Sequence, residues 1–213
     1  MGREAARAAD RDVALKLSAL LVPRIGGPSV NPYTPGDLWR EISHYGSTPA
    51  TAQTFVQDHG EKLYRRSIYT YWKRTAPPPN MMALDAPNRE VCTDNRAATT
   101  TPLQALVTLN DPQFVEAARH LAQNALACRK TEDEAIDEMA TRLLARPLMP
   151  KEKAVVKETL AKMRAFYEKQ PEATKEFLAV GESDVAGAAL TPQLAAMTMV
   201  ANQLMNLDEV LSK

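Results

Sequence analysis

Three polar residues that are each followed by proline constrain the fold of this chain more than any other feature. A threonine or aspartate can accept hydrogen bonds from the free amides of a first helical turn, and proline suits the first helical position. The pairs therefore predict helices over about 102–109, over about 112–127 and from 192 onward. The three pairs are Thr101-Pro102, Asp111-Pro112 and Thr191-Pro192, with Thr101, Asp111 and Thr191 as the expected caps.

Two further helices are predicted between these pairs. Thr131 and Glu134 have the spacing of a capping box, and Pro150 opens a segment in which Leu160 and Tyr167 recur on one face. Residues 172–187 are polar and weakly patterned, so they carry no helix signal. In the last helix we expect Leu194, Met197, Ala201 and Leu204 to lie on one side, and Met197, Met199 and Met205 to fill the core.

The first hundred residues are less regular. Residues 1–22 have the apolar spacing of an amphipathic helix, whereas 23–49 are rich in glycine and proline and predict a long loop with one or two helical turns at 37–44. In that loop we expect the apolar side chains of Ile25, Val30, Tyr33, Leu38, Trp39 and Ile42 to pack inward. Residues 61–74 fit a helix better than a strand. Three prolines then predict that this helix ends in an extended stretch at 75–80. Residues 81–100 show no clear period and predict an irregular strap.

The fold class expected from these signals is mainly α: an irregular helical domain with long ordered loops and a proline-rich strap. We expect one helical domain over residues 1–213. Its parts are an N-terminal helix (1–22), a loop-rich region (23–60) and a segment of strap and helices (61–213).

The balance of charge argues against a nucleic-acid partner. Lysine plus arginine and aspartate plus glutamate are 26 each, so no net field favours a polyanion. The aromatic and basic run at 62–74 has the composition of a single-strand binder, but we expect its rings to anchor the segment and its arginines to pair with acidic loop residues. No apolar run approaches the roughly 20 residues of a membrane span, and the chain shows no signal peptide.

Cysteine and histidine offer little chemistry. Cys92 and Cys128 are too few for a disulfide framework, so two buried free thiols are favoured over a single bridge. Arg89 and Arg96 could activate Cys92 as a nucleophile, but no histidine is near it in the sequence and a structural thiol is favoured. His44, His59 and His120 lack a second ligand at a metal-binding step, so we expect no metal site.

The strap at 85–96 is the segment that most invites a functional interpretation. Arginine forks can clamp carboxylates or carbonyls, so the strap can be a polar network that fastens irregular chain to the capped helices. Alternatively, its polar residues can line a cleft for a polar ligand such as a glycan. The candidate binding residues are Arg65, Asp85, Arg89, Glu90, Arg96, Gln104 and Asn110.

The sequence DAPNREVCTDNRAATTTPLQALVTLNDPQFVEAAR at 85–119 resembles a known family, the planctomycete-specific domain of unknown function found at the C-terminal end of proteins that contain c-type cytochrome domains. IGGPSVNPY, YRRSIYTYWKRTAPPP, LLARPLMPKE and NLDEVLSK agree with it. The resemblance implies a C-terminal piece of a larger periplasmic or cell-surface protein. Any haem would lie on upstream domains, because no CxxCH occurs in this chain, and no catalytic residue is carried over.

These observations favour a non-catalytic structural or docking module whose partners are the upstream domains or another protein. The alternative is a glycan-binding or glycan-processing domain that contacts polysaccharide at 85–96, with Asp85 or Glu90 as acid or base. The sequence leaves open whether the chain catalyses a reaction, although the missing catalytic set favours a module without one.

Overall fold

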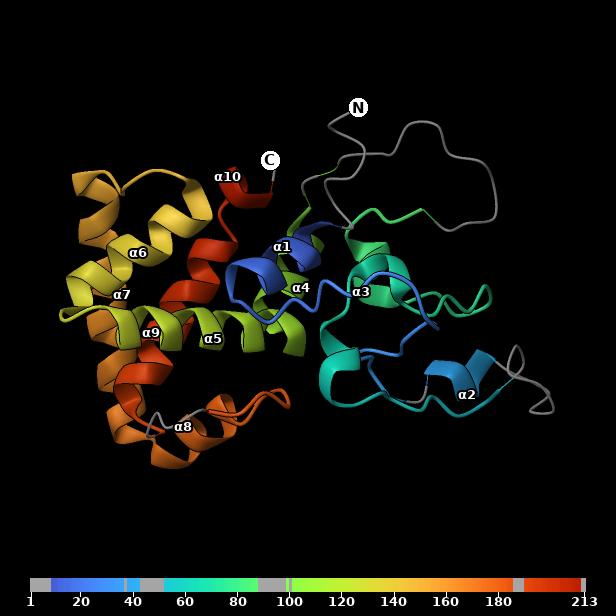
Figure 1. Ribbon diagram of the computed structural model, residues 1–213. Coiled ribbons are helices and arrows are strands. Elements are labelled where there is room, and N and C mark those ends of the chain that lie inside the picture. Colours follow the sequence, from blue (N-terminus) through green and yellow to red (C-terminus); the bar gives the residue numbers. More distant parts are fainter. Residues whose placement is uncertain are drawn as a thin grey trace. The chain divides into compact units, whose positions relative to one another are not determined.

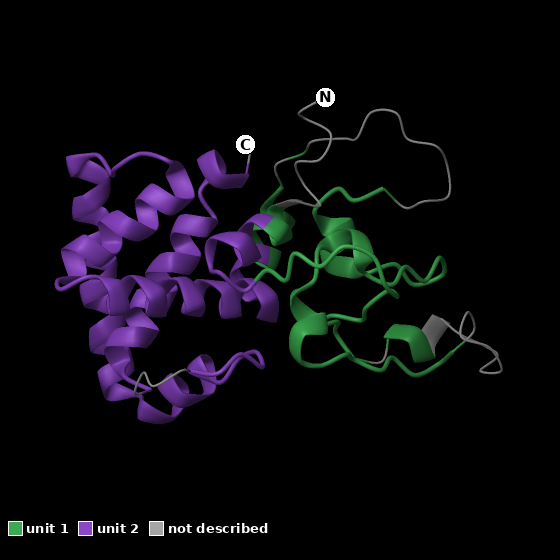
Figure 2. Ribbon diagram, viewed as in Figure 1, with its two compact units in different colours: residues 1–12, 21–107 green, residues 13–20, 108–213 purple. Residues whose placement is uncertain are grey.

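The computed structural model describes residues 9–36, 38–42, 52–87, 99, 101–185 and 190–211 (Figure 1). The fold is mainly α-helical, as the sequence predicts. The chain forms two compact units, residues 1–12 with 21–107 and residues 13–20 with 108–213 (Figure 2). We call them unit 1 and unit 2 and describe each by itself. The single helical domain expected from the sequence stays a prediction.

Unit 2 is a helical assembly around one buried helix, α9. This helix contacts α5, α6, α7, α8 and α10, and its closest packing is with α5 and α7. The helices are α5 (Pro112–Cys128), α6 (Glu132–Leu144), α7 (Pro150–Lys169), α8 (Pro171–Leu178), α9 (Pro192–Met205) and α10 (Asp208–Leu211).

Most of helix α9 is buried: Leu194, Met197, Ala201 and Leu204 lie in the core as expected, and burial extends beyond that side, although Gln193 and Gln203 are exposed. The five consecutive residues from Leu194 to Thr198 are all buried, so no side of the helix there faces solvent. Ala195, Ala196 and Ala201 are small enough to let neighbouring helices approach closely. Met197 and Met205 are buried in the core as expected, while Met199 is half-buried.

The polar caps lie where the helices of unit 2 begin. Asp111 accepts a hydrogen bond from the Gln113 amide at 2.9 Å, Thr131 from the Glu134 amide at 3.2 Å and Thr191 from the Leu194 amide at 3.2 Å. Each bond satisfies an amide that the first helical turn leaves free. The helices start at 112, 132 and 192 in consequence.

Helix α8 falls in the segment 172–187 that carried no helix signal, so that prediction is wrong for 172–178. The reason is tertiary. Phe177 stacks on Tyr167 of α7 with ring centroids 5.6 Å apart, and Leu178 is fully buried. Thr174 also donates to the Tyr167 carbonyl at 3.0 Å. Packing against α7 therefore stabilises this short helix.

Unit 1 contains short helices joined by long irregular segments. Helices α1 and α4 cross the unit boundary, and the predicted helix at 37–44 is found as α2. The elements are α1 (Ala9–Leu17), α2 (Leu38–Ile42), η2 (Gly60–Tyr64), η3 (Ser67–Tyr69), α3 (Pro79–Ala83) and α4 (Pro102–Asn110), of which η2 and η3 are 3₁₀ helices.

Three local predictions in unit 1 need correction. Helix α1 ends at Leu17 and not at 22, because Ala19 takes a left-handed φ of 65°. The segment 61–74 forms two 3₁₀ turns in place of an α-helix. The extended stretch predicted at 75–80 stops before Pro79: Pro78 has φ −57° and ψ 117°, but Pro79 occupies the first turn of α3, where its missing amide hydrogen is not needed.

The 3₁₀ segment differs from an α-helix because its backbone pairs with residues 22–30. The Val22 amide donates to the Tyr64 carbonyl at 3.0 Å, and the Val30 amide donates to the Tyr69 carbonyl at 2.8 Å. Isolated parallel bridges join Val22 to Arg65 and Val30 to Thr70. Backbone groups that bond outward in this way are lost to a regular helix.

The loop residues expected to pack inward do so only in part. Val30, Tyr33 and Trp39 are buried, and Leu38 is half-buried, but Ile25 is 87% exposed. The side chain of Ile42 lies outside the described residues.

Cys128 is a free thiol, but it is exposed and not buried as predicted; Cys92 lies outside the described residues. Within the described part of the chain, no helix combines the length and the apolar character that crossing a membrane requires.

A three-residue ion network joins the start of α7 to α10. Arg146 binds Glu152 with two hydrogen bonds of 2.9 and 3.0 Å, and it also bonds Glu209 at 2.7 Å. Glu152 in turn accepts from the Met149 amide at 2.7 Å, which caps α7. Hydrogen bonds from Arg146 and then from Met149 lower the pKa of Glu152 to about 2.

We therefore predict a pH-dependent effect of Glu152→Gln. Because the folded-state pKa lies below the ordinary value, the stabilisation by Glu152 is present above about pH 4.5 and is lost as the pH falls toward 2. The difference in unfolding free energy between wild type and variant, measured by urea titration, should shrink across that window. Glu168→Gln, at an exposed position of α7, is the control. A difference that stays constant with pH would contradict the prediction.

Candidate functional site

Asp85 and Gln104 form the centre of the polar cluster predicted from the sequence. Asp85 follows α3 and has a left-handed φ of 57°, a conformation that aspartate tolerates better than most residues. Its carboxylate accepts from the Thr99 amide at 2.8 Å, from the Thr99 hydroxyl at 2.8 and 2.9 Å and from the Gln104 amide group at 3.0 Å. Both carboxylate oxygens are thus engaged by the chain itself.

Gln104 links this carboxylate to the start of α4. Its side-chain oxygen accepts from the Thr101 amide at 3.1 Å, and the Gln104 amide donates to the Thr101 hydroxyl at 3.3 Å, which is a complete capping box. Its side-chain nitrogen donates to Asp85 and, at 3.2 Å, to the Thr99 hydroxyl. Gln104 is buried. The cluster therefore joins Asp85, which follows α3, to Thr99 and to the first turn of α4.

Arg65 holds a different segment. Its guanidinium donates to the carbonyls of Pro28 at 2.9 Å, Arg24 at 3.3 Å and Gly26, and it lies 3.8 Å from the centre of the Tyr69 ring. The Tyr69 hydroxyl accepts from the Gly26 amide at 2.8 Å. Arg65 is only 6% exposed, so this geometry fixes the loop 24–28 from its inner side.

A second buried arginine supports the first. Arg11 donates to the carbonyls of Arg65 and Leu63, each at 2.7 Å, and to the Ser67 hydroxyl at 3.2 Å. Its neighbour Asp12 accepts from the Ser67 amide and hydroxyl, both at 2.7 Å. Neither Arg11 nor Asp12 was predicted from the sequence, because they resemble any charged pair on a surface helix.

Of the four other predicted site residues, the structure describes one. Asn110 is exposed at the end of α4 and belongs to unit 2. Arg89, Glu90 and Arg96 lie outside the described residues. Of the predicted set, the structure brings together Asp85 and Gln104, while Arg65 binds the loop 24–28.

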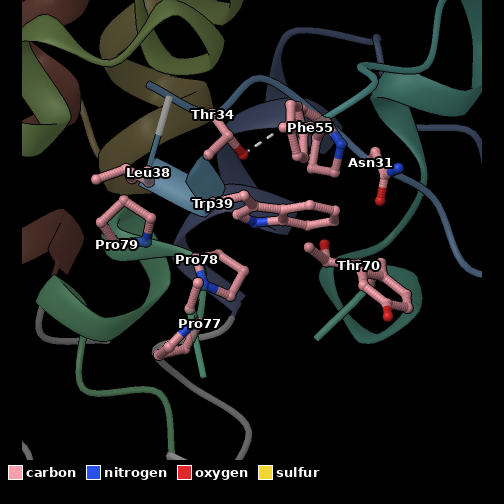
Figure 3. Close-up of a pocket in the computed structure, with 12 residues that line it drawn as sticks. Asn31, Thr34, Leu38, Trp39, Phe55, Thr70, Pro77, Pro78 and Pro79 are labelled. Carbon is pink, nitrogen blue, oxygen red and sulfur yellow. Dashed lines mark hydrogen bonds between the residues drawn. The ribbon is translucent and has the colours of Figure 1, made fainter. Parts of the chain in front are cut away.

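An aromatic and proline-walled pocket was not anticipated from the sequence. Trp39 lies at its centre, with Phe55 edge-on at 5.2 Å and Tyr71 tilted at 5.8 Å between ring centres. Figure 3 shows Pro77, Pro78 and Pro79 along one side of Trp39, and Asn31 and Thr70 on another. The triproline and the tryptophan are each conspicuous in the sequence, but nothing in their spacing places them together.

Lys73 adds a cation to the Trp39 ring. Its Nζ lies 4.4 Å from the ring centre and donates to the Ala52 carbonyl, and the residue is buried. Burial lowers the pKa of the Lys73 ammonium. The cation–π contact and the carbonyl bond both favour the charged form and oppose that effect.

Unit 2 has its own buried charged pair, Glu116 and Arg119 of α5, with 3.7 Å between Arg119 Nη2 and Glu116 Oε1. Glu116 accepts from the Ser183 amide at 2.6 Å. Arg119 donates to the carbonyl and hydroxyl of Ser183, both at 2.7 Å, and to the Leu178 carbonyl. The pair holds the segment that follows α8. Its spacing of three residues was visible in the sequence, but its partner segment was not.

Among the described residues, no group of three or more histidine, cysteine or acidic side chains is arranged to hold a metal ion. The polar clusters are instead arranged as anchors, in which charged side chains bind backbone groups of irregular segments.

Comparison with known proteins gives one match. A family model described as a protein of unknown function, PSD1 (DUF1553), matches residues 5–160, which is well over half of the chain. No curated protein and no solved structure matches the chain.

We predict that Gly181→Ala destabilises unit 2 strongly. Gly181 has a φ of 90°, and an added Cβ would lie 2.3 Å from the carboxyl carbon of Glu116. Glu116 is held by Ser183 and is fully buried, so it has no free space into which to move. The expected loss of unfolding free energy is about 3 kcal/mol, from left-handed strain plus overpacking.

The matched control is Gly26→Ala. Gly26 has a similar φ of 80°, but an added Cβ would meet nothing within 4 Å. This variant should therefore lose only the conformational part, about 1 kcal/mol. Equal losses for the two variants in chemical denaturation would show that the contact with Glu116 is not rigid.

Proposed function

The chain belongs to the PSD1 family of proteins of unknown function, and we propose that it is a non-catalytic docking module of a larger exported protein. The observation that carries this proposal is the pairing of a rigidly held loop with an exposed apolar side chain. Arg65 fixes the loop 24–28 by three carbonyl contacts, and the same loop leaves Ile25 87% exposed. The partner we propose is the upstream region of the parent protein, which on this proposal acts in the periplasm or at the cell surface.

A loop held in this way suits binding. Ordering a backbone residue costs roughly 1–2 kcal/mol, so a loop that is already ordered loses less freedom when a partner binds. The arginine does not restrain the loop from the solvent side, because it is buried beneath it. The outer side of the loop is thus available for contact.

Exposed apolar side chains on unit 1 indicate the chemistry of the partner. Ile25, Val56 and Ile68 are 87%, 69% and 69% exposed. Ile68 lies next to Tyr69, whose hydroxyl binds Gly26, so Ile25 and Ile68 belong to two segments that are joined by a hydrogen bond. An apolar partner surface would cover such side chains with a gain of about 25 cal/mol for each Å² buried.

The alternative, a glycan-binding or glycan-processing site around 85–96, has less support in the described residues. An acid or base must reach its substrate, but the Asp85 carboxylate accepts bonds from Thr99 and Gln104 with both oxygens. Asp85→Asn tests this alternative, since loss of binding on a glycan array with unchanged stability would favour it.

The docking proposal is tested with exposed variants. Ile25→Ser and Ile68→Ser should leave the melting temperature nearly unchanged, because exposed substitutions shift stability by about 0.5 kcal/mol or less. They should weaken association with the separately expressed upstream region at least tenfold in calorimetry. Val155→Ser, 63% exposed on α7 of unit 2, is the control and should bind as wild type does. Absence of wild-type association, or equal affinities for all four proteins, would refute the proposal.

Arg65→Lys tests the loop support separately. Lysine keeps the charge but cannot span three carbonyls with a planar fork, so we predict a loss of about 1–3 kcal/mol in unfolding free energy. Arg66→Lys is the matched control at the next position. Arg66 is exposed and makes one 3.4 Å contact with Asp12, so its replacement should cost about 0.5 kcal/mol or less. Similar losses for the two variants in urea denaturation would count against the special role of Arg65.

A further inference from the structure

The pocket beside Trp39 contains a buried polar group that the described part of unit 1 does not use. Thr70 is only 5% exposed, and its hydroxyl has no hydrogen-bond partner among the described residues. Thr70 lines the pocket, and Figure 3 shows its oxygen turned toward the space beside the Trp39 ring. Leaving a buried hydroxyl unbonded costs stability, so a partner from outside the chain is expected at this position.

The size of the pocket restricts what can reach this hydroxyl. Its volume is about 10 Å³, enough for one group of the size of a water molecule. A single hydroxyl fits this space, whereas the planar head of an amide or a carboxylate contains too many heavy atoms. The group that enters is therefore small and has one polar atom.

The lining residues determine the charge and the attachment of that group. None of the residues that line the pocket is charged, and the Lys73 ammonium on the Trp39 ring is bonded to the Ala52 carbonyl, so the lining supplies no counter-charge to offset the cost of desolvating an ion. The Thr70 hydroxyl can both donate and accept, and the Asn31 side chain lies in the same lining. Asn31 donates to the Val56 carbonyl at 2.9 Å through its nitrogen, which leaves its oxygen as an acceptor. The proline and aromatic walls suit a carbon that carries the hydroxyl.

We propose that this pocket binds one hydroxyl group of an uncharged molecule through Thr70 Oγ1. In the unliganded protein the group is a water molecule, and a neutral alcohol-type ligand displaces that water while its carbon skeleton packs on the prolines at 77–79. This site is independent of the docking surface at Ile25 and Ile68, because it uses different side chains and a different ligand chemistry.

The first test observes the site directly. A high-resolution crystal structure should contain an ordered oxygen within hydrogen-bonding distance of Thr70 Oγ1. In a ¹³C-methyl-labelled sample, ethanol should shift the Thr70 methyl signal saturably, with a dissociation constant in the millimolar range. Ethylammonium and acetate, which are of similar size but charged, should not shift it. The methyl signal of Thr198, buried in unit 2, reports general solvent effects in the same spectra.

Two substitutions separate hydrogen bonding from shape. Thr70→Val keeps the shape and removes the hydroxyl, so it should weaken ethanol binding at least tenfold, as followed by the Trp39 indole signal. Thr70→Ser keeps the hydroxyl and should retain binding within about threefold, while Thr198→Val, which removes a hydroxyl bonded to the Leu194 carbonyl, should bind as wild type does. A dry pocket, an unchanged Thr70 signal at molar ethanol, or equal binding by the valine variant would overturn the proposal.

Discussion

Unit 1 depends on one constraint: backbone carbonyls that are turned away from water must receive hydrogen bonds even where the chain forms no regular helix or sheet. Two arginines meet much of this need. Arg11 bonds the carbonyls of Leu63 and Arg65, and Arg65 bonds those of Arg24, Gly26 and Pro28. The two residues act in series, because Arg11 binds the backbone of the residue whose side chain holds the loop. An irregular segment is thereby held by hydrogen bonds at several of its carbonyls, and the docking proposal rests on this support.

Unit 2 solves the same problem in another way. Its helices satisfy most of their own carbonyls, and several buried polar side chains bond the chain where a helix ends. Glu116 and Arg119 serve the exit from α8, and Thr108 bonds Asn206 at 2.7 Å where α9 ends. Asn202 similarly donates to the Leu109 carbonyl at 3.0 Å near the end of α4. In unit 2 these buried polar side chains bond residues near helix ends, whereas in unit 1 Arg11 and Arg65 bond the carbonyls of irregular segments.

The parts of this fold that could be predicted from sequence are those governed by local chemistry. Thr101, Asp111, Thr131 and Thr191 cap helices because their short side chains reach amides two or three residues away, and proline suits the first turn wherever it occurs. The errors have a common cause in distance along the chain. Helix α8 is stabilised by Tyr167 of another helix. Residues 61–74 form no α-helix because their backbone groups bond residues 22–30. The same reason explains the site. Asp85 and Gln104 were predicted from their side-chain chemistry. The pocket around Trp39 joins segments forty residues apart, and no local sequence pattern predicts that contact.

The enclosed position of α9 has a consequence for synthesis of the chain. Helices α5 to α8 precede it in the sequence, yet they pack on it, and most of its own residues are buried. During translation these four helices leave the ribosome before the element that completes their core, so their apolar faces stay open to water or to chaperones until α9 emerges. Early termination that removes α9 would leave a polypeptide that keeps its other helix signals but lacks the helix on which they pack. Such a product is expected to aggregate or to be degraded.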